Sequence, residues 1–130
     1  MPSISQIPHF VTQAPWEIPD PGDGGTIDIR ESGVVNIVTL DAETRKLPEP
    51  LHVGQFILLN MKTDGGDGVV SVYESDLSTA SAINPTGNNT ITFANAGEAI
   101  LLIGVAVGTA YKWRAWALKP ETDGPALSTV

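Results

Sequence analysis

Short apolar runs separated by clusters of Gly, Asn, Asp and Pro constrain the fold of this chain more than any other feature. No window keeps an apolar period of about 3.6 residues, which a helix packed on a core would need. Runs of this kind, rich in Val, Ile, Thr and aromatic residues, are typical of strands. They predict strands at residues 26–30, 34–40, 55–61, 69–74, 90–94, 98–107 and 111–118. The expected fold is therefore all-β, a single compact β-sandwich or small β-barrel of about seven strands.

The connections between these runs carry residues that favour tight turns. Glycine and asparagine adopt positive φ at little cost, and clusters of them separate several of the predicted strands. The clearest clusters are residues 63–68, 85–89 and 95–97. The stretch from Asp41 to Leu51 is polar and contains Pro48 and Pro50, so it predicts a loop or one short helical turn.

The first 22 residues differ from the rest because they hold five prolines and no strand pattern. Proline fixes φ, lacks an N–H group and favours extended geometry in its predecessor, so this segment predicts a polyproline-like or strand-like strap. The chain is therefore divided into an extended Pro-rich N-terminal arm, residues 1–22, and a β-sandwich or barrel domain, residues 23–130.

Large apolar side chains in this arm indicate a contact with another chain. At about 3.1 Å per residue the arm would span on the order of 60 Å, more than the width of a domain of this size. The predicted anchors are Ile4, Ile7, Phe10 and Trp16. An arm that lies along its own domain, or one that is disordered, is the alternative.

Two predicted strands suggest surfaces that the domain cannot cover by itself. In residues 111–118, Trp113 shares a face with other apolar residues, whereas Trp116 lies on the face with Lys112 and Arg114 and needs a cover. That cover is the arm, a loop or a neighbouring subunit. Residues 99–107 are apolar on both faces, which predicts a strand covered on each side. Because a two-layer domain covers only one face of each sheet, we expect a homo-oligomer.

Composition excludes several classes of partner. Fifteen acids against seven bases give a formal charge of −8, which disfavours nucleic acid. The chain has no cysteine, and no apolar stretch approaches the roughly 18 residues needed to span a membrane. The start of the chain lacks the basic and apolar blocks of a signal peptide. We expect a soluble, single-domain protein made in a cytoplasm, with no nucleic-acid or membrane partner.

The sequence offers little that points to catalysis. Its two histidines, His9 and His52, have no acid or nucleophile at a spacing that marks a triad, so we do not expect an enzyme. Residues 20–25 and 64–68 combine Asp with Gly, as a calcium loop would, but they lack the ligand pattern of an EF-hand and are typical of turns. No cofactor and no metal site are predicted.

One polar constellation is more specific than the rest of the sequence. It comprises Glu43, Thr44, Arg45, Leu47, Pro50, Gly54 and Gln55, preceded by the Asp20–Gly25 stretch and followed by Trp113 and Arg114. In this order the motifs resemble a family of small β-rich tailed-phage capsid decoration proteins, also called cement or head-stabilising proteins. The resemblance covers residues 20–128 and leaves the start of the arm outside it.

The resemblance implies a structural virion protein on the outer capsid surface. Its expected partners are the major capsid protein and further copies of itself, most often as a trimer, with the arm docked on a neighbouring chain. Arg45, Arg114 and Trp116 are candidates for oligomer or capsid contacts. For the two arginines we favour structural ion pairs to nearby acids such as Glu43, with contacts to a partner's surface as the alternative. A carbohydrate-binding knob of a phage fibre or tail, with Trp16 and Trp116 stacking on sugars, is the second functional hypothesis.

Overall fold

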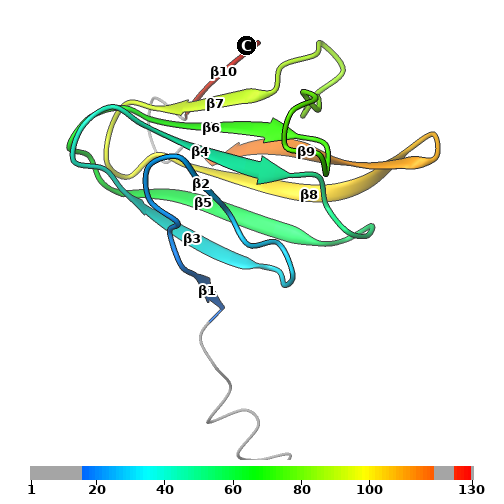
Figure 1. Cartoon of the computed structure of the whole chain (residues 1–130), viewed down its shortest axis with the longest axis horizontal. Coiled ribbons are helices and arrows are strands. Elements are labelled where there is room, and N and C mark those ends of the chain that lie inside the picture. The colour runs from blue at the N-terminus through cyan, green and yellow to red at the C-terminus, as the bar shows by residue number, and fades with distance from the viewer. Residues whose placement is uncertain (1–15, 119–124, 130) are drawn as a thin grey trace, which may run out of the picture.

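The computed structural model describes residues 16–118 and 125–129, and these residues form two five-stranded sheets packed face to face (Figure 1). The strands are β1 (Glu17–Ile18), β2 (Gly25–Thr26), β3 (Gly33–Val38), β4 (Glu43–Pro48), β5 (Phe56–Thr63), β6 (Gly68–Tyr73), β7 (Thr90–Phe93), β8 (Ala99–Val107), β9 (Ala110–Leu118) and β10 (Ala126–Ser128). The all-β prediction is confirmed, and the arrangement is an open sandwich. The described residues contain no helix, and hence none that would cross a membrane.

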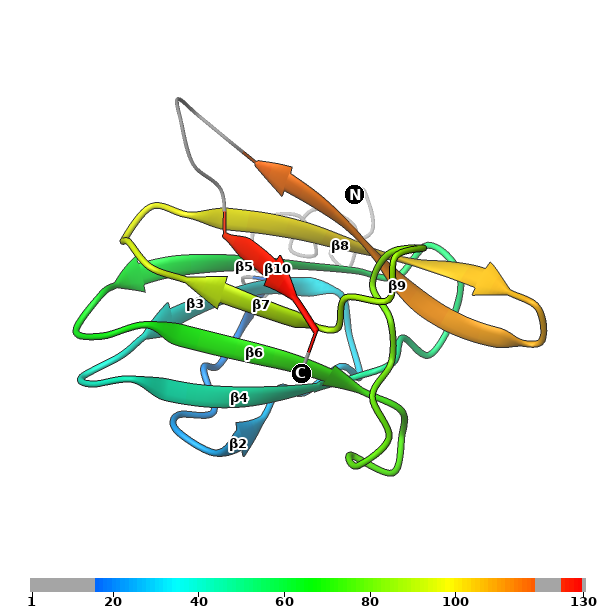
Figure 2. The ribbon, with the colours of Figure 1, turned by 90° about the horizontal axis from the view of Figure 1, so that it is seen from above.

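Both sheets mix parallel and antiparallel pairs because the chain passes back and forth between them. The first sheet has the order β1-β3-β5-β8-β9 and the second the order β10-β7-β6-β4-β2. The pairs β1–β3, β3–β5, β2–β4 and β4–β6 are parallel. Parallel neighbours need a crossover connection, and here the opposite sheet supplies it in place of a helix. Figure 2 shows the second sheet lying over the first in this arrangement.

The core lies between the sheets and is built from alternate residues of each strand. In β6 every second residue is buried, and β3 and β5 repeat that alternation. The largest buried side chain is Trp113 of β9, whose Nε1 donates a 2.7 Å hydrogen bond to the carbonyl oxygen of Pro48 at the end of β4. This bond joins the two sheets, so Trp113 contributes both volume and a polar contact to the core.

Most of the predicted strands are present, but the prediction for residues 41–51 is wrong. Instead of a loop or helical turn, β4 lies between β2 and β6 in the second sheet. The strand pattern was hidden because Arg45, a charged residue, is one of the two side chains of β4 that are fully buried, with Leu47 as the other. Pro48 stands at the last position of the strand, so the ladder ends there.

The remaining differences concern short pieces at the sheet edges. Of the predicted strand at residues 26–30 only Thr26 lies in β2, although Ile27 and Ile29 still enter the core. β1 and β10 were not predicted, since two or three residues carry too little pattern. Together with β4 they bring the number of strands in the described chain to ten rather than about seven.

The described end of the predicted arm belongs to the sandwich. β1 pairs in parallel with β3, the Val34 N–H donates a 2.7 Å bond to the Trp16 carbonyl, and Ile18 is buried in the core. Gly33 allows this approach, because a Cβ at that position would overlap the Trp16 carbonyl oxygen. Residues 17–22 are therefore attached to the body, although the sequence assigned them to the arm. Ile4, Ile7 and Phe10 lie outside the described residues.

Candidate interaction surface

The outward side of the first sheet carries an apolar surface that runs across four strands. Its members lie in register: Val34 of β3 is beside Leu58 of β5, which is opposite Leu101 of β8, which is opposite Trp116 of β9. Phe56 and Ile103 form a second row next to the first. We call these six residues the outer apolar face. In the part of the chain that the structure describes, the second sheet covers only the other side of this sheet (Figure 1).

Aromatic side chains stand at both ends of the outer apolar face. Trp116 is 67% exposed, and Trp16, at the opposite edge, is 59% exposed with its ring centroid 5.9 Å from that of Phe56. No described residue covers the Trp116 side chain, so the covering contact that the sequence predicts for it stays a prediction. The other expectation, that β8 is covered on both faces, is met on one side only, because Ile103 is 36% exposed.

A polar row borders the outer apolar face. The Asn36 side-chain amide donates a 2.7 Å bond to the Glu17 carboxylate, and Asn60 donates a 3.0 Å bond to the Asn36 side-chain oxygen. Asn36 and Asn60 are register neighbours in β3 and β5, one step along each strand face from Val34 and Leu58. Hydrogen-bonded polar groups therefore mark where the apolar surface ends.

The turn between β8 and β9 extends the apolar surface beyond the sandwich. Figures 1 and 2 both show this hairpin reaching past the neighbouring strands. Val107 and Tyr111 are exposed near its turn, and Leu51 and Val53 are exposed on the loop that packs against β8. The loop lies close because Gly104 has no side chain: a Cβ there would lie 2.6 Å from the His52 carbonyl oxygen.

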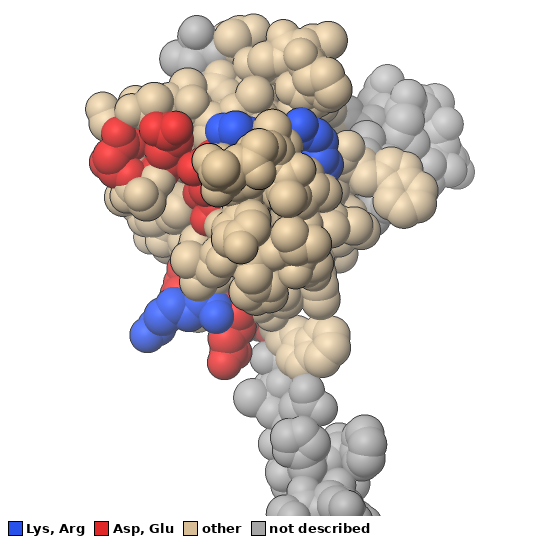
Figure 3. All heavy atoms as spheres, turned by 90° about the vertical axis from the view of Figure 1, so that its right-hand side faces the viewer, with Lys and Arg blue, Asp and Glu red and all other residues tan. Residues whose placement is uncertain are grey.

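We call Leu51, Val53, Val107 and Tyr111 the hairpin end. Figure 3, which views the molecule from this end, shows a broad region without charged groups, bordered by Lys, Arg, Asp and Glu. An exposed apolar region with a polar rim is typical of a protein–protein contact surface.

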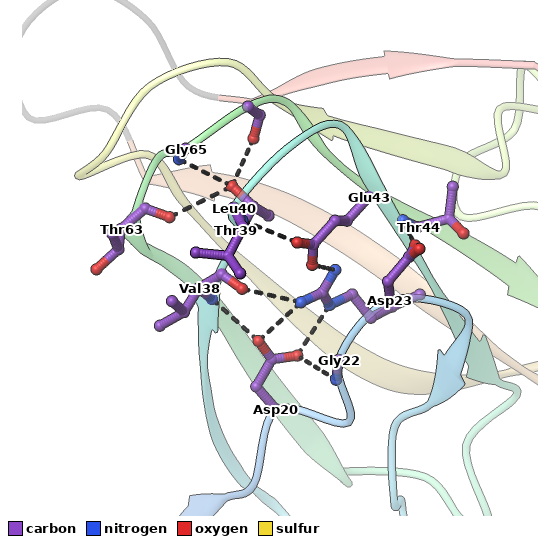
Figure 4. Close-up of polar contacts among 12 residues, drawn as sticks. Asp20, Gly22, Asp23, Val38, Thr39, Leu40, Glu43, Thr44, Thr63 and Gly65 are labelled. Atoms are coloured by element: carbon purple, nitrogen blue, oxygen red, sulfur yellow. Dashed lines mark hydrogen bonds and ion pairs between the residues drawn. The ribbon is translucent and has the colours of Figure 1, made fainter.

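A buried arginine fixes the segment that leads from β1 into β2 (Figure 4). Arg45 is 1% exposed and donates through Nε and Nη2 to the two carboxylate oxygens of Asp20, at 2.8 and 2.9 Å. Its Nη1 donates to Glu43 at 2.8 Å, and Nη2 also donates to the Val38 carbonyl at 3.0 Å. The predicted ion pair between Arg45 and Glu43 is confirmed, and the stronger bidentate partner is Asp20. Because the guanidinium is enclosed by its own chain, it presents no surface to a partner.

The carboxylates of this network have shifted pKa values. Burial alone would raise the pKa of Asp20, but hydrogen bonds from Arg45 and from the backbone N–H groups of Val38 and Gly22 outweigh it and lower the pKa. The pKa of Glu43 is lowered by the backbone N–H of Leu40 and then by Arg45. The pKa of Arg45 is raised, mainly by its hydrogen bond to Asp20. All three groups therefore stay ionised at neutral pH.

These shifts predict a loss of stability in acid. A carboxylate with a lowered folded-state pKa stabilises the fold above its unfolded-state pKa of about 4, and this stabilisation is lost as the pH falls through the folded-state pKa. We expect the unfolding midpoint of the wild-type chain to fall steeply below about pH 4. Asp20→Asn should show a shallower decline over the same range in urea titrations at several pH values. Parallel curves for the two proteins would exclude Asp20 as a source of the acid sensitivity.

A second polar cluster links β9 to the segments that follow β4 and β6. Lys112 Nζ lies 2.9 Å from Glu49 and 3.3 Å from Ser81 Oγ, and the Ser81 hydroxyl donates to Glu49 at 2.6 Å. Ser81 is fully buried, so a substrate has no access to its hydroxyl. His52 is exposed, and its ring Nδ1 lies 3.1 Å from the Val53 carbonyl oxygen.

The described residues were compared with the donor sets that bind metal ions. No group of three or more His, Asp or Glu residues there is arranged to hold a metal ion. In the glycine-rich loop that the sequence singled out, Asp20 is engaged by Arg45, and Asp23 accepts a 2.9 Å bond from the Thr44 N–H. These aspartates therefore serve the turn that precedes β2.

The other residues of the motif contribute to the core or hold the loop before β5. Leu47 is in the core, Pro50 is buried, and Gly54 donates to the Gly104 carbonyl at 2.9 Å from a positive-φ conformation. Gln55 is 1% exposed and holds the loop by accepting a 2.7 Å bond from the Leu51 N–H and donating to the Ile29 carbonyl. The motif is thus a set of contacts that shape β4 and the loop before β5.

Arg114 differs from the prediction made for it. It forms no ion pair within the described residues, and its Nη1 contacts the Trp113 carbonyl oxygen at 3.3 Å. Its strand partner is Ile103, so it lies beside the outer apolar face. Among the predicted interface residues, Arg114, Trp116 and Trp16 are on or beside this face, and Arg45 is not.

Sequence reasoning did not identify most of the outer apolar face. Phe56, Leu58, Leu101 and Ile103 were recognised as strand residues, and the double-sided apolar pattern of residues 99–107 was the signal that one side was uncovered. Comparison of the chain with protein-family models, with curated proteins and with solved structures gives no match.

Proposed function

We propose that this chain is a structural virion protein that decorates and stabilises a phage capsid by bridging capsomers as a symmetric oligomer, most simply a trimer. The single observation that carries the proposal is the outer apolar face, an apolar surface across four strands that, among the described residues, only Trp16 contacts at its edge and the second sheet leaves open. The resemblance in the motifs around Asp20, Arg45 and Trp113 supplies the kind of partner. The major capsid protein and further copies of the chain are the proposed partners.

The apolar character of this surface suits a stable contact between proteins rather than the conversion of a substrate. Burying one large apolar side chain contributes roughly 1.5–3 kcal/mol, and tryptophan is enriched among the residues that dominate binding energy. Symmetric association multiplies each contact by the number of copies, and linked contacts strengthen one another through effective concentration. The charge of −8 keeps the rest of the surface soluble at high local concentration.

Trp116→Ala tests the proposal directly. The purified chain, added to shells that its phage assembles without it, should co-sediment with them, and Trp116→Ala should weaken that association at least tenfold because a large exposed apolar contact is lost. Leu40→Ala is the matched control, since Leu40 is 81% exposed and lies outside the outer apolar face. Full retention of Trp116→Ala, or no binding by the wild-type chain, would contradict the proposal.

A carbohydrate-binding role is the second candidate because two tryptophans are more than half exposed. Sugars stack on such rings, and β-sandwiches often carry glycan sites. The outer apolar face offers few polar groups to orient a sugar, and its nearest side-chain amides, Asn36 and Asn60, are bonded to each other. Specific glycan binding that is lost in Trp116→Ala, with no association with shells, would favour this role.

A further inference from the structure

The segment that precedes the described residues has a pattern of its own. Residues 1–15 contain no Asp, Glu, Lys or Arg, and they include three of the ten prolines of the chain. Ile4, Ile7, Phe10 and Trp16 are separated by multiples of three residues. A polyproline II helix has about 3 residues per turn, so it would bring these side chains to one edge. Such an edge would be an uncharged ridge about 37 Å long, at about 3.1 Å per residue from position 4 to position 16, and apolar except for Gln13.

The outer apolar face matches the Ile4–Phe10 part of this ridge, about 19 Å at about 3.1 Å per residue, in chemistry and size. It is apolar across four strands, about 15 Å at roughly 4.8 Å between strands, and is bordered by the Glu17–Asn36–Asn60 row. Phe56 already receives Trp16, the last residue of the three-residue series. Trp16 thus lies on this face, so the face can accept a large apolar side chain.

The direction of the chain at Trp16 favours a second copy as the source of the ridge. β1 runs parallel to β3, and the Trp16 carbonyl is bonded to Val34, so the chain enters the sheet along the strands and not across them. To lie across its own face, the segment would have to turn sharply just before Trp16. Pro15 restricts how such a turn can be made, because proline fixes its own φ and disfavours helical geometry at the residue before it.

We infer that residues 1–15 of one copy bind to the outer apolar face of a neighbouring copy, with Ile4, Ile7 and Phe10 against Leu58, Leu101 and Trp116. Exchange of arms around a closed symmetry axis gives every face one arm and leaves none uncovered. This inference rests on the self-association in the proposed function. It adds which surface receives the arm and which chain provides it.

Cysteine cross-linking tests the inference, because the natural chain has no cysteine. Ile7→Cys and Leu101→Cys are made as separate single variants, mixed under native conditions and oxidised. We expect a disulfide-linked pair of chains in more than half of the material. Val69→Cys replaces Leu101→Cys in the matched control, since Val69 is half-buried like Leu101 but lies in the second sheet, and it should give no such product.

The double variant, Ile7→Cys with Leu101→Cys, separates the two possible sources of the arm. A product linked within one chain at high dilution, with no product between chains, would overturn the inference in favour of an arm on its own domain. Absence of any cross-link to Leu101→Cys would overturn it as well. Neither result changes the Trp116→Ala shell assay, so failure of the arm exchange and failure of the proposed function can be told apart.

Discussion

Asp20→Asn is expected to lower the free energy of unfolding by about 2–3 kcal/mol, measured by urea denaturation at pH 7. Removing one partner of a fully buried ion pair costs about 3–5 kcal/mol, because the other charge is left uncompensated. Arg45 is 1% exposed but keeps Glu43 and the Val38 carbonyl, so the expected loss is somewhat smaller. The variant also directs an amide N–H₂ group at the guanidinium in place of a carboxylate oxygen.

Asp28→Asn is the matched control because Asp28 binds Arg30 with similar geometry at the surface. The Arg30 and Asp28 side chains are 85% and 45% exposed, and solvent screens their attraction. We therefore expect no measurable change in the unfolding midpoint. Equal effects of Asp28→Asn and Asp20→Asn would show that burial of Arg45 does not determine the strength of its pair.

The same arginine explains the main error in the sequence-based fold. Strands such as β3, β5, β6 and β8 were predicted correctly because their apolar residues alternate or run together. β4 hides its alternation, since one of its inward residues is Arg45 and its carboxylate partner Asp20 lies 25 residues away. A buried charge is recognisable only when its partner is known, and that pairing depends on the tertiary fold.

The sequence predicted that an apolar contact surface exists, but it did not predict which residues form that surface. Exposure of Trp116 followed from its position beside Lys112 and Arg114 in a strand. The alignment of Leu58 with Leu101 and of Leu101 with Trp116 depends on strand order and register, which no local pattern reveals. The parallel pairing of β1 was also hidden, because Pro15 and Pro19 flank a strand of two residues.

Trp113→Ala is expected to have the largest effect on stability, a loss of about 3–5 kcal/mol in the free energy of unfolding. The indole is fully buried between the sheets, so truncation leaves a large cavity. It also removes the hydrogen bond that Nε1 donates to the Pro48 carbonyl oxygen at 2.7 Å. Trp113→Phe should cost less than Trp113→Ala, because the ring still fills most of the volume while the hydrogen bond is lost.

Trp116→Ala provides the control from the same strand, three residues further along β9. Its side chain is 67% exposed, so its truncation opens no cavity, and the unfolding midpoint of the isolated chain should stay nearly unchanged. Comparison of Trp113→Ala with Trp116→Ala therefore distinguishes a tryptophan that stabilises the core from one that contacts a partner. Suppose that Trp116→Ala lowers the free energy of unfolding as much as Trp113→Ala, but only at concentrations where the chain is oligomeric. Trp116 is then buried in the contact between copies. If the loss appears in dilute monomer, its cover belongs to the same chain.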